Sequence, residues 1–329
     1  MRDKVFVTGA NGFVGLNIVE QLLSEGYEVV AYVRPSSNIK FLADFPVTIK
    51  RGELTNFDQV CSAMAGYQFV IHTAGNTSCD ERDLPELTLT NVTGTDTVVQ
   101  AAIAMGVQRL VFTSTTSTIG AENHKQSEAG EQEPLTGFRS KSPYSRTKRK
   151  AEKIVLDAQN QGLETIILNL AEVVGGFDHN LQWGRMVLAV QHDQVPFMPP
   201  GGGTFCSAKQ AALAHVKALS HGESGQRYII GGANHDFQDF IQLIAKKLGR
   251  PVSATTGQYY WSRVKTWLHG IAPRVFTQKP LVDAYRLRVF GGHYFFNSAK
   301  AKQQLHYQAA DLSDMVDESI QWYRHHGFI

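Results

Sequence analysis

Cysteine is scarce in this chain of 329 residues, which contains only Cys61, Cys79 and Cys206. Three cysteines so far apart can build neither a disulfide framework nor a Cys-x-x-Cys metal site. The twelve histidines include no His-x-x-x-His pair with an acid nearby, so we expect no bound metal. A reducing, cytoplasmic location fits this composition best.

Long apolar runs and an excess of one charge are also missing. No stretch approaches the roughly 20 apolar residues of a membrane-spanning helix, and the apolar run before the first glycine is too short for an export signal. The 32 Lys and Arg against 30 Asp and Glu leave a net charge of +2. This charge is too small and too evenly spread to predict a nucleic-acid partner. With 43% hydrophobic residues, the composition is typical of a globular protein.

The first 170 residues alternate short β-branched runs with longer helical patterns, which predicts a parallel sheet wound by helices on both faces. We expect strands at 4–8, 28–33, 47–50, 69–72, 109–113 and 165–169, and helices near 14–24, 57–64, 83–105 and 144–159.

The alternation breaks after Ala171, and a Gly/Pro segment, VPFMPPGGG, precedes a helix near 208–220 and a strand at 228–230. We expect that helix and strand to return to the first lobe. The predicted fold is therefore α/β, with a doubly wound nucleotide-binding domain at 1–170 and 205–230. A smaller, discontinuous substrate-binding lobe would consist of residues 171–204 and 231–329.

A glycine-rich turn follows the first predicted strand. In TGANGFVG, Gly9, Gly12 and Gly15 are spaced by three and an amphipathic helix begins at once. Glycines here permit a tight turn and let a dinucleotide pyrophosphate sit on the helix N-terminus. Glycines are common at any strand-to-helix turn, but the place of this turn on the first strand favours a dinucleotide site.

The end of the second strand indicates which dinucleotide is bound. An acid at this position would hydrogen-bond the ribose of NAD, but EVVAYV is followed by Arg34, Pro35, Ser36, Ser37 and Asn38. A guanidinium with neighbouring hydroxyls suits a 2′-phosphate. NADP is therefore favoured over NAD, the alternative being an ordinary surface arginine.

A phenol and an amine lie four residues apart in SPYSRTKRKAEK, so Tyr144 and Lys148 share one helical face. We expect the cationic amine to lower the pKa of the phenol from about 10 toward neutrality, which would make it usable for acid/base catalysis. Pairs at this spacing also occur by chance on solvated helices. The hydroxyl cluster FTSTTSTIG ends the fifth strand at the sheet edge where open α/β folds bind ligands, so three features converge on one crevice.

Together these residues resemble the extended short-chain dehydrogenase/reductase family, also called the NAD-dependent epimerase/dehydratase family, along the whole chain. TGANGFVG is similar to its glycine motif, RGELTNFD to its adenine-side motif, HTAG and NVTGT to its later cofactor motifs, and YSRTK to its Tyr-x-x-x-Lys. The C-terminal segments GGGTF, SGQRYIIGG, KPLVDAYRLR, YFFNSAKAKQQLHY and QWYRHHGFI resemble the branch with dihydroflavonol 4-reductase-like proteins and hopanoid-associated sugar epimerases. The resemblance implies a Rossmann sheet.

The resemblance also implies roles for single residues. Tyr144 would be the proton donor, Lys148 would hold the nicotinamide ribose and tune the phenol, and Thr115, with Ser114 as the alternative, would hydrogen-bond the substrate oxygen. Asn91 matches a residue that mostly braces the sheet. The cofactor contacts implied by position are Gly9, Asn11, Gly12, Phe13, Val14, Gly15, Arg34, Glu53, Leu54, Thr73, Ala74, Gly75, Thr113, Tyr144, Lys148, Leu170 and Val173.

Departures from the family pattern bear on the reaction. Leu170 stands where a proline is common, and Cys206 to Lys209 replace an aspartate motif. Dehydratases of the family resemble one another in an Asp-Glu pair after the catalytic threonine, where this chain has Thr116 and Ser117. Elimination therefore lacks its acid and base.

Epimerases of the family mostly retain NAD, whereas Arg34 favours NADP, which is usually exchanged. The leading interpretation is an NADPH-dependent reductase of a ketone or other carbonyl. The alternatives are a nucleotide-sugar epimerase with bound NAD(P) and a non-catalytic NADP sensor, although a sensor would not need Thr115, Tyr144 and Lys148.

Further expectations concern the substrate and the partners. In residues 257–276, Trp261, Val264, Leu268 and Ile271 fall on one helical face, beside Trp267 and flanked by Arg263, Lys265 and Arg274. Core packing of the small lobe is the simplest interpretation. A cover that touches a membrane surface or admits a hydrophobic substrate is the alternative.

Two more expectations concern a headgroup site and the oligomeric state. Asn180 and Arg185 could hold a polar or phosphate headgroup, although a helix cap and a surface cation are the simpler roles. The helices at 83–105 and 144–159 match those that form a four-helix homodimer interface in many relatives.

Overall fold

The computed structural model describes residues 3–271 and 282–329. Its main feature is a parallel sheet of seven strands in the order β10-β7-β5-β4-β1-β2-β3. The strand order reverses between β1 and β4, so the chain winds outward from this point in both directions. The strands are β1 (Lys4–Thr8), β2 (Glu28–Val33), β3 (Thr48–Arg51), β4 (Phe69–His72), β5 (Arg109–Thr115), β7 (Glu164–Leu170) and β10 (Gln226–Ile230).

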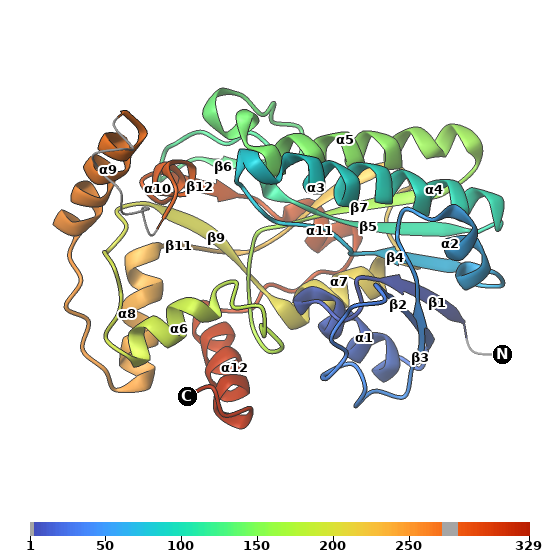
Figure 1. Ribbon diagram of the computed structural model, residues 1–329, viewed down its shortest axis with the longest axis horizontal. Coiled ribbons are helices and arrows are strands. Elements are labelled where there is room, and N and C mark those ends of the chain that lie inside the picture. Colours follow the sequence, from blue (N-terminus) through green and yellow to red (C-terminus); the bar gives the residue numbers. More distant parts are fainter. Residues whose placement is uncertain (1–2, 272–281) are drawn as a thin grey trace.

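Helices cover both faces of this sheet (Figure 1). One face packs on α1 (Phe13–Ser24) and α7 (Ala208–Ala218), and the other on α2 (Phe57–Met64), α4 (Gly94–Ala104) and α5 (Pro143–Asp157). The central strands are buried on both sides, as runs such as VFVT and TIILNL require. The doubly wound α/β fold expected from the sequence is therefore confirmed.

A second, mixed sheet lies beyond the carboxyl ends of these strands. It contains β6 (Glu128–Ala129), β8 (Glu172–Val174), β9 (Gly202–Ser207), β11 (Ala233–Asp236) and β12 (His293–Phe296), and only the β9–β11 pair is antiparallel. The helices in this half of the chain are α6 (Gly184–Gln191), α8 (Phe237–Leu248), α9 (Thr256–Ile271), α10 (Ala284–Phe290), α11 (Ala299–Gln304) and α12 (Leu312–His325).

The two lobes are not separated in sequence. Strand β10 is part of the seven-stranded sheet, and α7 packs on one face of that sheet. Helix α11 lies against β10, with Ala301 and Leu305 in the same core. β9 runs across the boundary expected at residue 205. The exact division into 1–170 with 205–230 and 171–204 with 231–329 stays a prediction.

Several predicted elements differ in detail. The third strand is shifted by one residue, and the helix expected at 83–105 consists of α3 (Leu84–Thr88), a π-helical segment (Leu89–Thr93) and α4. The short 3₁₀ turns are η1 (Glu81–Asp83), η3 (Thr116–Thr118), η4 (Gly137–Lys141) and η5 (Ala158–Gln161).

The helix expected at 257–276 exists as α9, but the core-packing interpretation is wrong for Trp261 and Val264. Both side chains are exposed, and the aromatic residue of α9 that is buried is Tyr259. Leu268 is half-buried. The Ile271 side chain and residues 272–276 lie outside the described part of the chain. Within that part, no helix has the length and apolar character needed to cross a membrane.

Candidate active site

The glycine turn after β1 allows very close backbone contact with the neighbouring strand end. Gly9 has a φ of +68°, and a Cβ there would lie 2.6 Å from the backbone nitrogen of Ala74. A Cβ on Gly15 would lie 2.1 Å from the carbonyl oxygen of Gly9. Only glycine satisfies both positions, so the turn is built for close backbone approach. Thr73 and Ala74 therefore lie beside it, as expected.

The N-terminus of α1 is left without a side-chain cap. Its N-cap residue is Gly12, which provides no hydrogen-bonding side chain, and the first turn contains no acid. Free backbone N–H groups and the helix dipole favour an anion at such a terminus. Because this terminus lies at the reversal point between β1 and β4, the residues present fit a dinucleotide pyrophosphate.

The loop after β2 continues this site. Arg51 donates to the carbonyl oxygens of Pro35 (2.7 Å) and Ser37 (3.3 Å), and Asn11 donates to the carbonyl of Asn38 (3.2 Å). These bonds fix the loop next to the glycine turn and leave the Arg34 side chain exposed. An exposed guanidinium on a braced loop is free to meet an anionic group.

The other positions expected at the cofactor are spread along the same edge. Leu54 packs near Gly94, and Leu170 pairs with Thr115 at the ends of β7 and β5. Glu53 is exposed, with no side-chain hydrogen bond of its own among those found for the described residues. The remaining positions lie on the glycine turn or on the ends of β4, β5 and β8: Phe13, Val14, Gly75, Thr113 and Val173.

Thr115 and Tyr144 meet at the carboxyl edge of the sheet. Thr115 ends β5, Tyr144 lies in the first turn of α5, and the Thr115 side chain is near enough to the phenol to lower its pKa. Lys148 lies one helical turn further on, where its Nζ donates to the carbonyl of Thr113 (2.8 Å) and sits 4.0 Å from the Phe112 ring centroid. The structure thus brings the three expected catalytic residues together.

The expected lowering of the phenol pKa by the amine is wrong. Burial raises the pKa of Tyr144 well above its usual value, and only the Thr115 hydrogen bond opposes this to a small extent. Burial also lowers the pKa of Lys148 to about 7, against an opposing effect of Glu152. The amine donates to the Thr113 carbonyl and is not among the groups that shift the pKa of Tyr144, so desolvation of the phenol dominates. The phenol therefore keeps its proton at neutral pH.

A buried carboxylate on α5 links this helix to the ends of the neighbouring strands. Glu152, 5% exposed, accepts hydrogen bonds from Ser114 (2.5 Å), Thr118 (2.7 Å) and Asn169 (2.7 Å) through one oxygen. Its other oxygen pairs with Arg227 of β10 at 3.2 Å. Since Ser114 is committed to this carboxylate, Thr115 is the hydroxyl available beside the phenol. Asn169, which precedes the Leu170 that stands in place of the family's common proline, is part of this hydrogen-bond network.

Sequence reasoning missed three charged residues near Tyr144. Glu172 begins β8 and accepts a hydrogen bond from the indole of Trp183 (2.9 Å), and burial raises its pKa. Arg139 and Arg286 oppose that rise, so both guanidinium groups act on this carboxylate. Glu172 comes two residues after the end of β7. Because open α/β sheets bind ligands beyond the carboxyl ends of their strands, sequence reasoning could have found this residue. The arginines carry no such signal.

Arg139 is buried between the two sheets. One of its Nη atoms donates to the Thr116 carbonyl (3.2 Å), and the other has no partner among the described residues. Its guanidinium lies 4.7 Å from the ring centroid of Tyr294 and 5.6 Å from that of Phe296. The surroundings of Arg139 are therefore aromatic, and Glu172 is a nearby counter-charge.

Other expected residues have structural roles. The Asn91 side chain bonds both backbone groups of Asn76 (2.8 and 2.9 Å), so it braces the loop after β4. Arg185 is exposed and donates to the carbonyl of Leu181. The start of α6 is capped by Asp178 and not by Asn180, which is exposed. Neither Asn180 nor Arg185 is brought to the crevice by these contacts.

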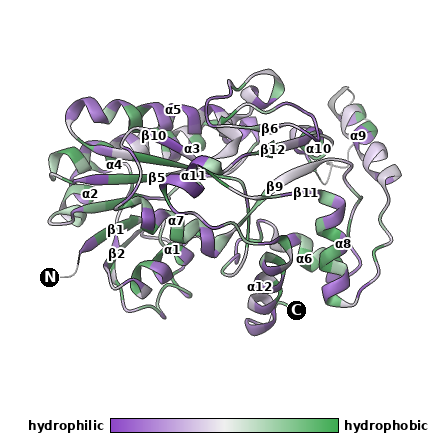
Figure 2. Ribbon diagram, turned by 180° about the vertical axis from the view of Figure 1, so that it is seen from behind, coloured by the Kyte–Doolittle hydropathy of each residue, from purple (hydrophilic) through white to green (hydrophobic). Residues whose placement is uncertain are grey.

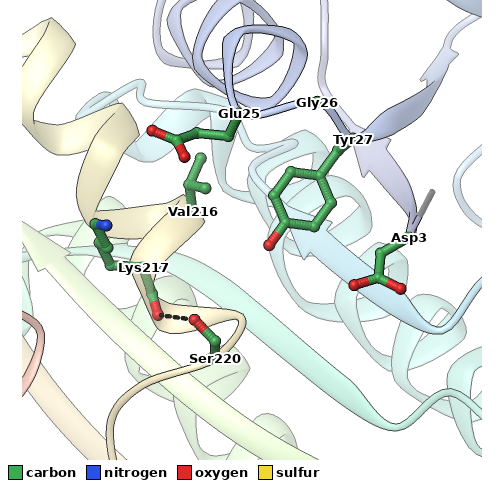
Figure 3. Close-up of a pocket in the computed structure, with 7 residues that line it drawn as sticks. All are labelled: Asp3, Glu25, Gly26, Tyr27, Val216, Lys217 and Ser220. Carbon is green, nitrogen blue, oxygen red and sulfur yellow. Dashed lines mark hydrogen bonds between the residues drawn. The ribbon is translucent and has the colours of Figure 1, made fainter.

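A surface depression of about 250 Å³ lies at the opposite edge of the sheet (Figure 3). It is lined by Asp3, Glu25, Gly26, Tyr27, Val216, Lys217 and Ser220. These residues flank the amino ends of β1 and β2, so the depression is separate from the strand ends that carry Thr115 and Gly9. In the described residues, no three His, Cys, Asp or Glu side chains form a group that could hold a metal ion.

An uncapped helix over a glycine turn, together with a Thr-Tyr-Lys constellation at the same edge, defines a nicotinamide-dinucleotide-dependent oxidoreductase. Residues 5–231 match the NAD dependent epimerase/dehydratase family. The chain belongs to this family.

Relatives with assigned names match along the whole chain. A Synechocystis protein provisionally named dihydroflavonol 4-reductase is 27% identical over 100% of this chain and 97% of its own. Sterol demethylase protein B of Methylococcus capsulatus is 26% identical, covering 98% and 99%. A 3-beta-hydroxysteroid dehydrogenase of Mycolicibacterium neoaurum is 33% identical, covering 93% and 87%.

Solved structures agree on the fold. The protein gox2253 superposes with a TM-score of 0.84 at 27% identity, covering 99% of both chains. The UDP-glucose 4-epimerase of Thermotoga maritima has a TM-score of 0.81 at 18% identity, covering 98% of this chain and 99% of its own. The second likeness concerns the fold alone.

We predict that Glu152→Gln lowers the free energy of unfolding by about 3 kcal/mol, because it leaves the Arg227 cation without its counter-charge in a buried network. Urea denaturation measures this change. The matched control is Glu164→Gln, which breaks a surface pair with Arg109 and should cost no more than about 1 kcal/mol. Equal costs at the two positions would contradict the structural role of the network.

Proposed function

We propose that this protein is an NADPH-dependent reductase that converts a ketone of a hydrophobic substrate to an alcohol. The observation that carries the proposal is the place of Thr115 at the end of β5 beside Tyr144 in the first turn of α5, whose phenol keeps its proton. The turn after Thr115 supplies no carboxylate: Thr116 offers its carbonyl to Arg139, and the Ser117 backbone bonds the Thr115 side chain. The site thus offers a proton donor and, near it, a hydroxyl that could bind the substrate oxygen.

The chemistry assigned to this chain's residues follows from their positions. A carbonyl oxygen placed between Thr115 and Tyr144 receives two hydrogen bonds, which stabilise the negative charge that develops there. Tyr144 then delivers its proton to that oxygen. The bound nicotinamide supplies the hydride for the carbonyl carbon. No other acid is required, since burial keeps the phenol protonated at neutral pH.

Lys148 is placed to assist this proton transfer. Its pKa of about 7, lowered by burial, means that the amine exchanges protons near neutral pH. It lies on the same face of α5 as Tyr144 and bonds the carbonyl of Thr113 at the end of β5. We assign it to positioning the ribose and to balancing charge when the phenol has lost its proton.

A hydrophobic substrate is supported by the names of the relatives and by the aromatic side chains around Arg139. A sterol demethylase protein and a hydroxysteroid dehydrogenase are among the relatives, and these names refer to steroid substrates. In this chain the rings of Phe138, Tyr285 and Tyr294 pack together near Arg139, with centroid separations of 5.8 and 6.4 Å. Aromatic rings of this kind suit an apolar ligand with few polar groups.

We propose NADP as the cofactor because Arg34 is exposed on the braced loop after β2. NAD is the alternative. Nucleotide-sugar epimerisation with a retained cofactor is the second candidate function, favoured by the half-buried Glu172 near Tyr144, which offers a second acid/base group. We further propose a cytoplasmic homodimer through α4 and α5. Exposed Leu89 (54%) and Met105 (37%) at the two ends of the α4 region support this interface.

Replacing Tyr144 by Phe removes the proton donor but no charge. We predict that kcat for NADPH oxidation with a ketone substrate falls at least about 100-fold, while NADPH binding, followed by nicotinamide fluorescence, changes little. Tyr27→Phe, in the depression of Figure 3, is the matched control and should leave both quantities unchanged. Wild-type turnover in Tyr144→Phe would refute the assigned role.

Arg34→Ala tests the cofactor preference. We predict that the Kd for NADPH rises about tenfold or more, because a charge-assisted hydrogen bond to the 2′-phosphate is lost. The Kd for NADH should hardly change, and the exposed cation Lys302 serves as a control when replaced by Ala. Equal losses for both dinucleotides would show that Arg34 does not read the phosphate.

A further inference from the structure

Helix α9 presents an apolar stripe to solvent. Eight large apolar side chains of the described residues are exposed, and half of them lie on this one helix. They are Tyr260 (55% exposed), Trp261 (57%), Val264 (43%) and Trp267 (65%). The spacing of three and four residues puts them on one side of the helix. Figure 2 shows α9 at the outer end of the molecule, beyond α10 and far from the seven-stranded sheet.

The inner side of α9 is held by ordinary packing. Tyr259 is fully buried, its hydroxyl donates to the carbonyl of Leu287 in α10 (2.7 Å), and its ring lies 5.6 Å from that of Phe197. The helix thus has one face in the protein and one aromatic face in water. An exposed cluster of this kind marks an interaction surface.

The stretch of sequence that contains α9 has charges of one sign. Residues 240–282 contain seven Lys and Arg and no Asp or Glu, in a chain whose totals are nearly balanced. The even charge distribution expected from the whole sequence is therefore wrong for this segment. On α9 itself Arg263 and Lys265 are exposed, and Lys265 lies over the Trp261 ring at 5.6 Å. Neither cation is paired with a carboxylate among the ion pairs of residues 3–271 and 282–329.

We propose that α9 docks on an anionic phospholipid bilayer. Trp and Tyr favour the boundary between headgroups and acyl chains, and neighbouring cations are attracted to anionic headgroups. The two exposed cations of α9, Arg263 and Lys265, have no carboxylate partner among the described ion pairs, and they favour this partner over a second copy of the chain. A two-fold copy seated on α9 would bring the same basic segment against itself.

The docking face is connected to the candidate active site through α10. Tyr259 is bonded to Leu287, and the preceding residue, Arg286, acts on Glu172 and Cys79 in the crevice. Tyr285 packs on Phe138 at 5.8 Å. A bilayer under α9 is therefore one helix away from the crevice, which suits delivery of a membrane-dissolved substrate. This last step rests on the proposed function, whereas the docking does not.

Flotation with vesicles tests the docking without any measurement of turnover. Wild-type protein should float with vesicles of phosphatidylcholine and phosphatidylglycerol, and Trp261→Ser/Trp267→Ser should reduce its partition coefficient at least about tenfold. Phe57→Ser is the matched control, because Phe57 is also exposed (44%) but lies on α2 at the other end of the molecule. It should float like wild type. Absence of wild-type flotation would overturn the proposal.

The charge component is tested separately. Arg263→Glu/Lys265→Glu should lower partition into the anionic vesicles at least about 25-fold, since each basic residue near the surface contributes about fivefold. Wild type should bind pure phosphatidylcholine weakly. Equal binding to both vesicle types would contradict the anionic surface.

Bound NADPH and cooperative thermal unfolding verify that the α9 variants are folded. Sedimentation then distinguishes lipid from a second copy. If Trp261→Ser/Trp267→Ser converts a dimer to a monomer and the wild type does not float, α9 is a protein interface and the proposal fails. If wild type floats but reduces no ketone, the docking stands and the proposed function fails.

Discussion

The buried carboxylate of Glu152 is the interaction on which the geometry of the crevice depends. It joins α5 to the end of β5 through Ser114, to the turn η3 through Thr118, to β7 through Asn169 and to β10 through Arg227. Thr115 lies between two of these anchors, and Tyr144 and Lys148 precede Glu152 by two helical turns and one. One carboxylate therefore sets the position of the hydroxyl relative to the phenol and the amine.

This arrangement explains why the chain must return to the first sheet after residue 204. Arg227 supplies the only cation paired with Glu152 among the ion pairs of the described residues, and β10 carries it to the edge of the sheet. A buried carboxylate without a counter-charge would be costly. Strand β10 is thus part of the site even though it provides no residue that meets substrate.

The sequence was sufficient for features that depend on local pattern. The strands are β-branched runs, the turn requires glycine at Gly9, and Tyr144 and Lys148 are separated by one helical turn, so each could be predicted. Glu152, Arg139 and Arg227 could not, because their roles arise from contacts between segments far apart in the chain. The pKa of Tyr144 was mispredicted for the same reason: the amine was known to be near, but the burial of the phenol was not.

In the small lobe, sequence reasoning left open which face of the helix at 257–276 is buried. Apolar spacing alone does not distinguish a buried helix face from an exposed one. Core packing is therefore the simplest interpretation of Trp261 from the sequence, whereas the aromatic residue of α9 that is buried in the structure is Tyr259. The structure shows that the second lobe has two sides of different character. Its inner side carries Glu172 and Tyr285 toward Tyr144, and its outer side carries α9 to solvent.

We propose that NADPH bound at this site transfers one hydride to a substrate ketone and that the oxidised cofactor is then exchanged. Incubation with NADPH deuterated at the transferred position of C4, together with a series of ketones of rising chain length, tests it most directly by mass spectrometry. The account predicts one deuterium at the carbinol carbon of the alcohol, NADP formed in equal amount, and a higher rate for the longer ketones. Unchanged NADPH, together with a retained dinucleotide and epimerisation of a sugar nucleotide, would contradict it.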